Sequence, residues 1–227
     1  MNSQLRAEHI QKSYRRGKQT VLRDVSFTAE SGQCIGILGA NGCGKSTLLS
    51  ILAGVQPPDS GRLFWNDNPL TYHTRDHDII GYVPQENPLM EELSAYDNLR
   101  LWYCDSAIDL ETALRDGVPA MLGIPDFLKT RVSQMSGGMK KRLSISCAVA
   151  DDPHVLLLDE PGAALDLVCK ERISVYLKEC KSQGKILLLA THEEREIELC
   201  DKIYILKNGV LTEPDYDGNI HHLAGLI

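Results

Sequence analysis

A glycine-rich segment between a buried strand and a helix constrains this chain more than any other feature. Gly39–Thr47 reads GANGCGKST, follows the apolar run Cys34–Leu38 and opens a helical pattern through Leu48–Ala53. Glycines let the backbone turn tightly enough for its N–H groups to point at a phosphate chain. The N-terminus of the following helix adds partial positive charge. The segment therefore predicts a phosphate-binding loop, and a glycine-rich turn without a ligand is the weaker alternative.

Each residue of this loop has an expected part in binding a nucleoside triphosphate. Lys45 is placed to reach the β- and γ-phosphates, and Ser46 carries a hydroxyl that can coordinate Mg²⁺. Cys43 contributes only its backbone, so a cysteine is acceptable there. The residues expected to contact the nucleotide are Gly39, Ala40, Asn41, Gly42, Cys43, Gly44, Lys45, Ser46 and Thr47.

A pair of carboxylates follows a second buried strand. The apolar run Val155–Leu158 leads directly into Asp159 and Glu160. In an open α/β sheet, ligands gather beyond the carboxyl ends of the strands, which is also where the glycine-rich loop lies. We therefore expect Asp159 to hold the Mg²⁺ shell, and Glu160 to orient or deprotonate a water that attacks the γ-phosphate. A strand that merely ends in an acidic turn is the alternative.

Short apolar runs separated by helical segments indicate the fold class. Ile79–Val83 and Ile186–Ala190 resemble the two runs already named. Such runs indicate a mostly parallel sheet that is covered on both faces. Alternating segments that suit antiparallel strands with one wet face occur nearer the N-terminus, at Leu5–Ile10, Val21–Thr28 and Arg62–Trp65. Asn208-Gly209, between two apolar runs, is typical of a tight hairpin turn.

The stretch from residue 86 to residue 135 is expected to be helical. Ser94 and Asp97 resemble a capping box at the start of one helix, and Asp109–Arg115 and Pro119–Leu122 suggest two more. We predict one α/β domain over residues 1–227. Residues 1–85 and 151–227 form a P-loop NTPase core with an N-terminal antiparallel β subdomain. Residues 86–150 form an inserted α-helical subdomain that ends with the helix after residue 136.

Composition excludes several classes of protein. The chain has 24 Lys+Arg against 31 Asp+Glu, for a net charge of −7, so direct binding to nucleic acid is not expected. No apolar run approaches the roughly 20 residues that a membrane-spanning helix needs. The N-terminus lacks the apolar core of a secretory signal. The 7 cysteines show neither a C-x-x-C pair nor zinc-ligand spacing, which is typical of free thiols in a reducing compartment. We expect a cytosolic chain.

A third motif narrows the function. Met135–Arg142 reads MSGGMKKR and precedes the helical run Leu143–Ala150. Its glycines and the following helix N-terminus again make an anion site, although the chain already has a phosphate loop. A second such site makes sense if it closes over a nucleotide that another subunit holds. A serine helix cap with a Gly-Gly hinge is the plain alternative.

With these motifs in order, the sequence resembles the ATP-binding subunits of ABC transporters over nearly its whole length. Gly39–Thr47 matches the family's phosphate loop, and Ser136, Gly137 and Gly138 match its signature motif. The resemblance implies that Glu160 is the catalytic carboxylate. Further matches are Gln85 (Mg²⁺ and attacking water), Ala164-Leu165-Asp166 (contact with the partner's site), His192 (γ-phosphate) and Tyr14 (adenine stacking).

The chain departs from the family pattern at its signature. Met135 and Met139 stand where the family commonly has Leu and Gln. Met135 conserves volume, whereas Met139, still expected beside the nucleotide, loses an amide and so weakens hydrogen bonding to ribose or neighbouring backbone. Pro161–Ala164 replaces a more polar stretch. The run Ser136–Arg142 is similar to versions seen in exporter-type members, which favours export.

The resemblance implies a mechanism. ATP and Mg²⁺ draw two such subunits together head to tail, as a homodimer or heterodimer, and hydrolysis lets them separate. Lys45, Gln85, Glu160 and His192 are the expected catalytic set, and Ser46, Gln85 and Asp159 the expected metal ligands. A separate membrane permease is expected to hold this subunit at the inner face of the cell membrane. The residues expected to dock it are Leu89, Met90, Trp102 and Tyr103.

Two other functions remain open at this stage. One is a soluble ATPase switch of the same fold that acts on nucleic acid, ribosomes or cofactor assembly. Such proteins often carry tandem ATPase domains or inserted coiled coils, and this sequence has neither. The other is a kinase built on a phosphate loop, which leaves Ser136–Gly138 unexplained.

Overall fold

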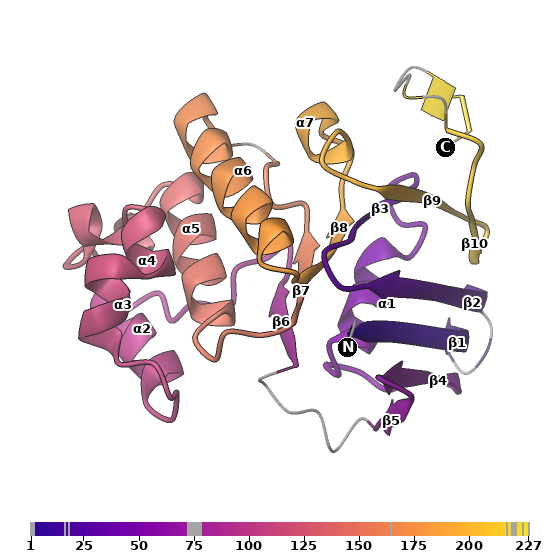
Figure 1. Ribbon diagram of the computed structural model, residues 1–227, viewed down its shortest axis with the longest axis horizontal. Coiled ribbons are helices and arrows are strands. Elements are labelled where there is room, and N and C mark those ends of the chain that lie inside the picture. The colour runs from indigo at the N-terminus through magenta and orange to yellow at the C-terminus, as the bar shows by residue number, and fades with distance from the viewer. Residues whose placement is uncertain are drawn as a thin grey trace.

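A computed structural model describes residues 3–15, 17, 19–71, 79–163, 165–216, 218, 222–223 and 225–226. In this part of the chain, one mixed sheet of ten strands runs through the molecule in the order β5-β4-β1-β2-β10-β9-β3-β8-β7-β6. Helices α2 to α5 lie together beyond one end of the sheet, and the antiparallel strands lie at the other end (Figure 1). The strands are β1 (Gln4–Tyr14), β2 (Gln19–Glu30), β3 (Cys34–Leu38), β4 (Ser60–Trp65), β5 (Asn68–Leu70), β6 (Ile80–Val83), β7 (Val155–Asp159), β8 (Ile186–Ala190), β9 (Lys202–Lys207) and β10 (Val210–Thr212).

The parallel strands form one side of this sheet, from β9 to the edge strand β6. β3 pairs in parallel with β8 and β9, and β7 pairs in parallel with β6 and β8. β7 is buried at every position, and its side chains enter two different cores in alternation. Val155 and Leu157 pack in one apolar cluster with α1, whereas Leu156 and Leu158 pack in another with α5 and α6. The prediction of a sheet covered on both faces is therefore confirmed.

The antiparallel part also follows the prediction. β1 pairs antiparallel with β2 and with β4, and β4 with β5. The predicted hairpin joins β9 to β10, with Asn208 and Gly209 at φ of 52° and 79°. A two-residue turn with both φ values positive matches the twist of the strands that it joins. β10 then meets β2 at Val210 and Asp24, so both parts belong to one sheet.

The helices divide between the two faces and the insert. They are α1 (Lys45–Leu52), α2 (Ala95–Tyr103), α3 (Leu110–Asp116), α4 (Val118–Met121), α5 (Gly137–Ala148), α6 (Leu167–Ser182) and α7 (Glu194–Ile197), with short 3₁₀ turns at Ile124–Phe127 and Val132–Gln134. The predicted capping box is only half formed. Ser94 Oγ accepts the Asp97 N–H at 3.1 Å, but the Asp97 carboxylate accepts the Ser94 hydroxyl rather than its backbone N–H. The shorter aspartate does not reach back as glutamate does.

This architecture places the loops that carry the predicted site residues together, at the carboxyl ends of the parallel strands. The segments after β3, β6, β7 and β8 all leave the carboxyl ends of neighbouring parallel strands. The residues predicted to bind and hydrolyse the nucleotide are on these segments, apart from Tyr14 and the Ser136–Met139 turn. Within the described ranges, no helix is both long and apolar enough to cross a membrane.

Candidate functional site

The glycine-rich loop has the backbone geometry that phosphate binding requires. Gly42 and Gly44 have φ of 78° and 115°, in the region that favours glycine. A Cβ on Gly39 would lie 2.5 Å from the Leu206 carbonyl oxygen and 2.6 Å from Cys43 Sγ. Gly39 is therefore required because β9 passes directly behind it. The loop ends at Gly44, which caps α1 in a left-handed conformation. The free N–H groups of α1 then face the space above the loop.

Lys45 is the buried cation of this loop. Only 7% of the residue is exposed, and its Nζ donates to the Gly39 carbonyl at 2.7 Å. This hydrogen bond holds the ammonium group against the start of the phosphate loop. In this position it supplies positive charge at the place where the phosphates are expected.

Asp159 and Ser46 form a pair that suits a magnesium ion. Asp159 is 1% exposed, and its Oδ2 is buried without a hydrogen-bond partner among the described residues. Burial raises the pKa of this carboxyl above its usual value, and a hydrogen bond from Ser46 opposes the shift. A buried oxygen with a free lone pair, next to a hydroxyl, is the donor chemistry that Mg²⁺ prefers. These residues therefore fit the ion.

Three of the predicted catalytic side chains meet at Glu160. Gln85 Nε2 donates to Glu160 Oε2 at 3.1 Å, and His192 Nδ1 lies 3.7 Å from Glu160 Oε1. Glu160 itself has a φ of 48°, which is unusual for a residue other than glycine. Such strain costs on the order of 1–3 kcal/mol and is typical of functional positions. The conformation turns the carboxylate at the end of β7 towards Gln85 and His192.

A cavity of about 430 Å³ joins these groups to the loop. Tyr14 is 37% exposed at one side of it, and its hydroxyl donates to Gln56 Oε1 at 2.8 Å. The lining residues are Tyr14, Gln19, Val21, Asn41, Gly42, Gly44, Lys45, Ser46, Thr47, Gln85, Glu160 and His192. Gln19 and Val21 were not predicted, because β2 gives no chemical signal in the sequence. Ala40 and Cys43 line a neighbouring cavity of about 410 Å³, together with Asn41 and Gly42.

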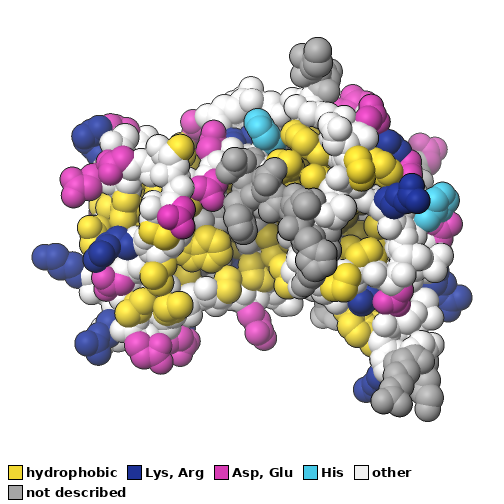
Figure 2. Space-filling view, turned by 90° about the horizontal axis from the view of Figure 1, so that it is seen from below, with side chains coloured by type: hydrophobic (Ala, Val, Ile, Leu, Met, Phe, Trp, Pro, Cys, Tyr) yellow, Lys and Arg dark blue, Asp and Glu magenta, His cyan; other side chains and the backbone are white. Residues whose placement is uncertain are grey.

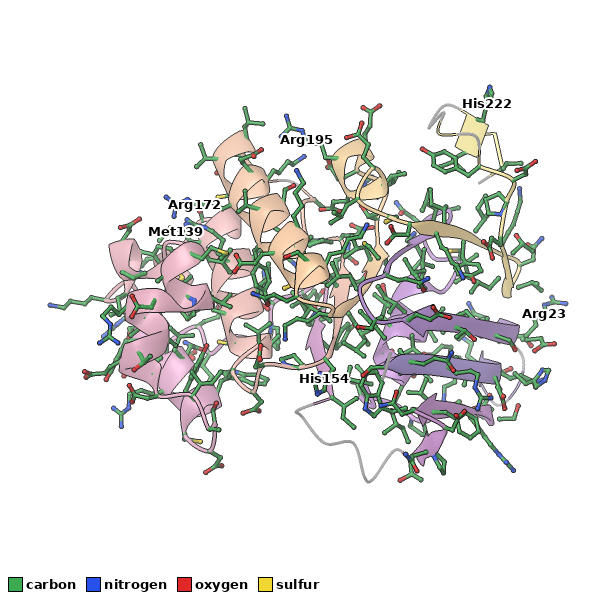
Figure 3. All side chains as sticks on the ribbon, in the orientation of Figure 1. Arg23, Met139, His154, Arg172, Arg195 and His222 are labelled. Carbon is green, nitrogen blue, oxygen red and sulfur yellow. The ribbon has the colours of Figure 1, made fainter. Side chains whose placement is uncertain are left out.

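The Ser136–Met139 turn lies apart from this cavity. Among the described residues that line it, none comes from the turn. Ser136 caps α5 by accepting the Met139 N–H at 3.3 Å. Gly138 is buried, and a Cβ there would lie 2.6 Å from Cys169 Sγ, whereas a Cβ on Gly137 would meet nothing within 4 Å. Gly138 is needed for packing against α6, and Gly137 is open to the surroundings. Figure 3 shows Met139 on the helical side of the molecule.

Lys141 was missed by the sequence analysis. It is 5% exposed on α5, and its Nζ donates to the Pro84 and Gln85 carbonyls at 3.0 and 3.2 Å. Burial lowers the pKa of this ammonium group. The contact ties the helix after the Ser136–Met139 turn to the segment that carries Gln85. A lysine in a basic run looks like a solvated residue, so the sequence contained no signal for it. The predicted contact segment 164–166 lies partly outside the described residues, because Ala164 is not among them.

Comparison with known proteins decides the family. Residues 22–163 match the ABC transporter family. The chain belongs to that family. It is 36% identical over 210 residues to the Nod factor export ATP-binding protein I of Sinorhizobium fredii, a match that covers 88% of this chain and 59% of that protein. It is 32% identical over 219 residues to the lantibiotic transport ATP-binding protein SrtF of Streptococcus pyogenes, covering 95% of this chain and 92% of that one.

Solved structures of the ABC family extend the comparison to the fold. One is a dimeric ATP-binding cassette in a post-hydrolysis state, bound to ADP and Pi. It matches with a TM-score of 0.82 and 27% identity, covering 95% of this chain and all of that one. The predicted α/β fold with a P-loop NTPase core is thereby confirmed. As an ABC family ATPase, the chain has ATP and Mg²⁺ as its expected nucleotide and metal partners.

Proposed function

We propose that this chain is the ATP-binding and ATP-hydrolysing subunit that powers an ABC transporter of the exporter type. The single observation that carries the proposal is the cavity in which Lys45, Ser46, Glu160 and His192 converge. The names of the relatives favour export over import: one is a Nod factor export protein and another a lantibiotic transport protein. The transported substrate contacts a permease rather than this subunit, so none is assigned.

In this proposal, the chain's own residues divide the work of hydrolysis. The loop N–H groups and Lys45 bind the phosphates, and Tyr14 stacks on the adenine. Ser46, Asp159 and Gln85 would hold Mg²⁺, which when bound would neutralise negative charge on the phosphates. Glu160 orients the attacking water and accepts its proton, and His192 contacts the γ-phosphate. The hydrogen bond from Gln85 and the nearby His192 hold the Glu160 carboxylate in place.

The second part of the proposal is a head-to-tail dimer. Ser136 and Gly137 are exposed at the N-terminus of α5 and lie outside the cavity of their own chain. A helix N-terminus with an exposed serine is suited to phosphate. A nucleotide on the loop of one subunit would therefore lie against the Ser136–Met139 turn of the other. Two solved structures of one related bacterial cassette are dimeric, which supports the dimer itself.

The third part is a permease that docks on the helical insert. Met90 and Trp102 are 55% and 44% exposed, as the proposal requires, and Leu101 is 48% exposed beside them. Tyr103 is wrong as a docking residue: it is 7% exposed and its hydroxyl donates to the Ser146 carbonyl. Leu89 packs against the core cluster. Figure 2 shows hydrophobic side chains exposed on the helical side, at the left of that view. Docking there would hold the subunit at the inner face of the cell membrane.

A docking experiment tests the proposal against the alternative of a soluble ATPase switch. The tagged chain is isolated from detergent-solubilised membranes of its own cells, and the recovered proteins are identified. We expect a polytopic membrane protein in wild type and much less of it with Trp102→Asp. Val175→Asp is the matched control, because Val175 is 47% exposed on α6, outside the insert. Recovery with ribosomes or soluble proteins, unaffected by Trp102→Asp, would favour the switch.

A further inference from the structure

One carboxylate near the site is used by none of the motifs. Glu196 lies on α7, four residues after His192. The side chain turns inwards, and its Oε2 is buried without a hydrogen-bond partner in the described part of the chain. An unpartnered carboxylate oxygen in a protein interior costs free energy. An acid in this position therefore calls for an explanation beyond packing.

The other contacts of Glu196 reach both catalytic loops. Its carboxylate lies near the Thr191 hydroxyl and the Gly162 N–H, and both groups favour its ionised form. Thr191 directly precedes His192, and Gly162 follows Glu160 by two positions. The approach to Gly162 is so close that a Cβ there would lie 2.5 Å from Glu196 Oε1. Glu196 thus bridges the segment after β8 and the segment after β7.

Thr191 extends this bridge around His192. The residue is 1% exposed, and its Oγ1 accepts the Glu193 N–H at 3.0 Å. Because the same hydroxyl interacts with Glu196, the carboxylate favours one orientation of Thr191 and with it of the backbone on both sides of His192. The His192 ring itself is held less firmly, since 59% of its side chain is exposed and its Nδ1 lies 3.7 Å from Glu160 Oε1.

The charges around Glu196 come from three helices. On α7 and its N-terminus, Glu193 and Arg195 line the same small cavity, and Figure 3 shows Arg195 beside α6 and α7. From α6, Lys170 forms an ion pair with Glu193 at 2.8 Å and opposes the effect of that acid. From α5, Lys141 is close enough to respond to the charge on Glu196. Burial nonetheless dominates and raises the pKa of Glu196 to about 7.

We infer that Glu196 is a positioning residue: its ionised carboxylate ties the segment bearing His192 to the segment that follows Glu160, so that both groups face the cavity together. This inference rests on the proposed roles of Glu160 and His192. Hydrogen bonds to an ionised carboxylate are stronger than those to a neutral carboxyl. The bridge is therefore tightest above pH 7 and weakens as the pH falls and Glu196 takes up a proton.

Stability and activity change in opposite directions with pH. The pKa of Glu196 in the folded chain, about 7, lies above the 4.5 that is usual for a glutamate. The folded state therefore holds this proton more firmly than the unfolded state, and its contribution to stability is lost as pH rises from about 4.5 to about 7. Ionisation thus weakens the fold while it tightens the bridge. A residue with a purely structural role would not separate these two effects.

The test is the pH profile of ATP hydrolysis in Glu196→Gln, whose side chain resembles the protonated acid. We expect kcat to be about tenfold lower than in wild type at pH 8.5, with KM for ATP nearly unchanged. The ratio of the wild-type kcat to the variant kcat should fall towards one below about pH 6, because Glu196 is then protonated in the wild type as well. At pH 8.5 the Tm of the variant should be no lower than that of wild type. Glu194→Gln, which removes an exposed acid from the same helix, should follow wild type throughout.

A second variant keeps the inference testable if Glu196→Gln does not fold. Thr191→Val preserves shape but removes the hydroxyl that lowers the pKa of Glu196. We expect its kcat to fall and its pH dependence to move to higher pH. A ratio of wild type to Glu196→Gln that is close to one, or equal at every pH, would overturn the inference. Glu160→Gln is measured alongside: if that variant still hydrolyses ATP, the proposed role of Glu160 fails, whatever Glu196 shows.

Discussion

The phosphate loop and the Ser136–Met139 turn are both glycine-rich segments that open a helix, yet the chain completes only the first. Around the loop, Lys45 is buried, and the cavity brings Gln85, Glu160 and His192 to the same space. Around the turn, Gly138 is fixed by α6 while Gly137 faces open space. The same local chemistry thus yields one enclosed site and one exposed half-site.

The difference shows which part of catalysis one chain can supply. An anion site gains strength when other charged groups and low-dielectric walls surround it. The loop has both, because four strand ends meet beside it. The turn lacks such walls: Ser136 and Gly137 are exposed, and the nearest charged groups, such as Arg142, whose Nε donates to the Gly138 carbonyl at 3.3 Å, lie behind Gly138. The phosphate loop therefore predicts nucleotide binding within one chain. The Ser136–Met139 turn predicts that two chains assemble.

The largest expected effect concerns the complete site. Glu160→Gln keeps the size of the side chain but cannot accept a proton. We expect turnover to fall at least about a hundredfold, while ATP binding is retained and an ATP-bound dimer accumulates. Steady-state hydrolysis, nucleotide binding and size-exclusion chromatography measure the three outcomes. Near-normal turnover would remove Glu160 from the catalytic role.

Mixing two inactive variants tests whether the exposed half-site acts across the dimer. Lys45→Ala damages the loop and Ser136→Arg blocks the turn, so each homodimer has two defective sites. In a mixed dimer, one site receives both defects and the other receives none. With equal amounts and random pairing, we expect activity to return to about a quarter of wild type. Pull-down with two tags verifies that mixed dimers form.

The interpretation of this mixture needs one further control. If verified mixed dimers stay silent, a linked dimer with one wild-type and one disabled site separates the two explanations. Activity in that linked dimer, with none in the mixture, would contradict the shared-site model. If neither the linked dimer nor the mixture hydrolyses ATP, both sites of a dimer must be intact for either site to be active.

The two glycines of the turn should separate packing from ligand binding. Gly138→Ala forces a Cβ against Cys169 Sγ, so we expect a loss of about 1–3 kcal/mol in stability and a lower Tm. Gly137→Ala meets nothing in its own chain. Its Tm should equal that of wild type, while ATPase activity falls because the partner's nucleotide is crowded. Equal Tm losses in both variants would mean that the turn is merely structural.

The smallest expected effect is that of the helix cap at Ser136. Ser136→Ala removes the acceptor of the Met139 N–H and should cost about 1 kcal/mol. Ser94→Ala removes the equivalent cap of α2 and serves as the matched control. Thermal unfolding should shift alike in the two variants. Only Ser136→Ala should also lower ATP hydrolysis, and an equal loss in both would assign Ser136 to capping alone.

Much of the fold and the site could be predicted because the responsible signals are local. Five buried positions in β7, the Asn208-Gly209 turn and the spacing of Gly42, Gly44 and Lys45 depend on neighbours within a few residues. These features can therefore be predicted from the order of residues along the chain. The order of the motifs along the chain then pointed to the family to which the protein belongs.

What the sequence could not decide depends on contacts between distant segments. Tyr103 looked like an exposed docking residue but is buried, because α5 carries the carbonyl that accepts its hydroxyl. Lys141 looked solvated but reaches back to the Gln85 segment. Burial and charge compensation are properties of three-dimensional packing, so polar residue type alone does not report them.

The sequence by itself determined that this chain has a phosphate loop, a strand ending in two carboxylates and a second glycine turn. Each of these follows from backbone conformation and residue type over a short span. Only the tertiary structure decided that Gln85, Glu160 and His192 meet at one cavity while Gly137 does not, and that Glu196 bridges two of the loops involved. The reason is physical: strand order and helix packing set those distances, and both arise from pairings between residues far apart in the chain.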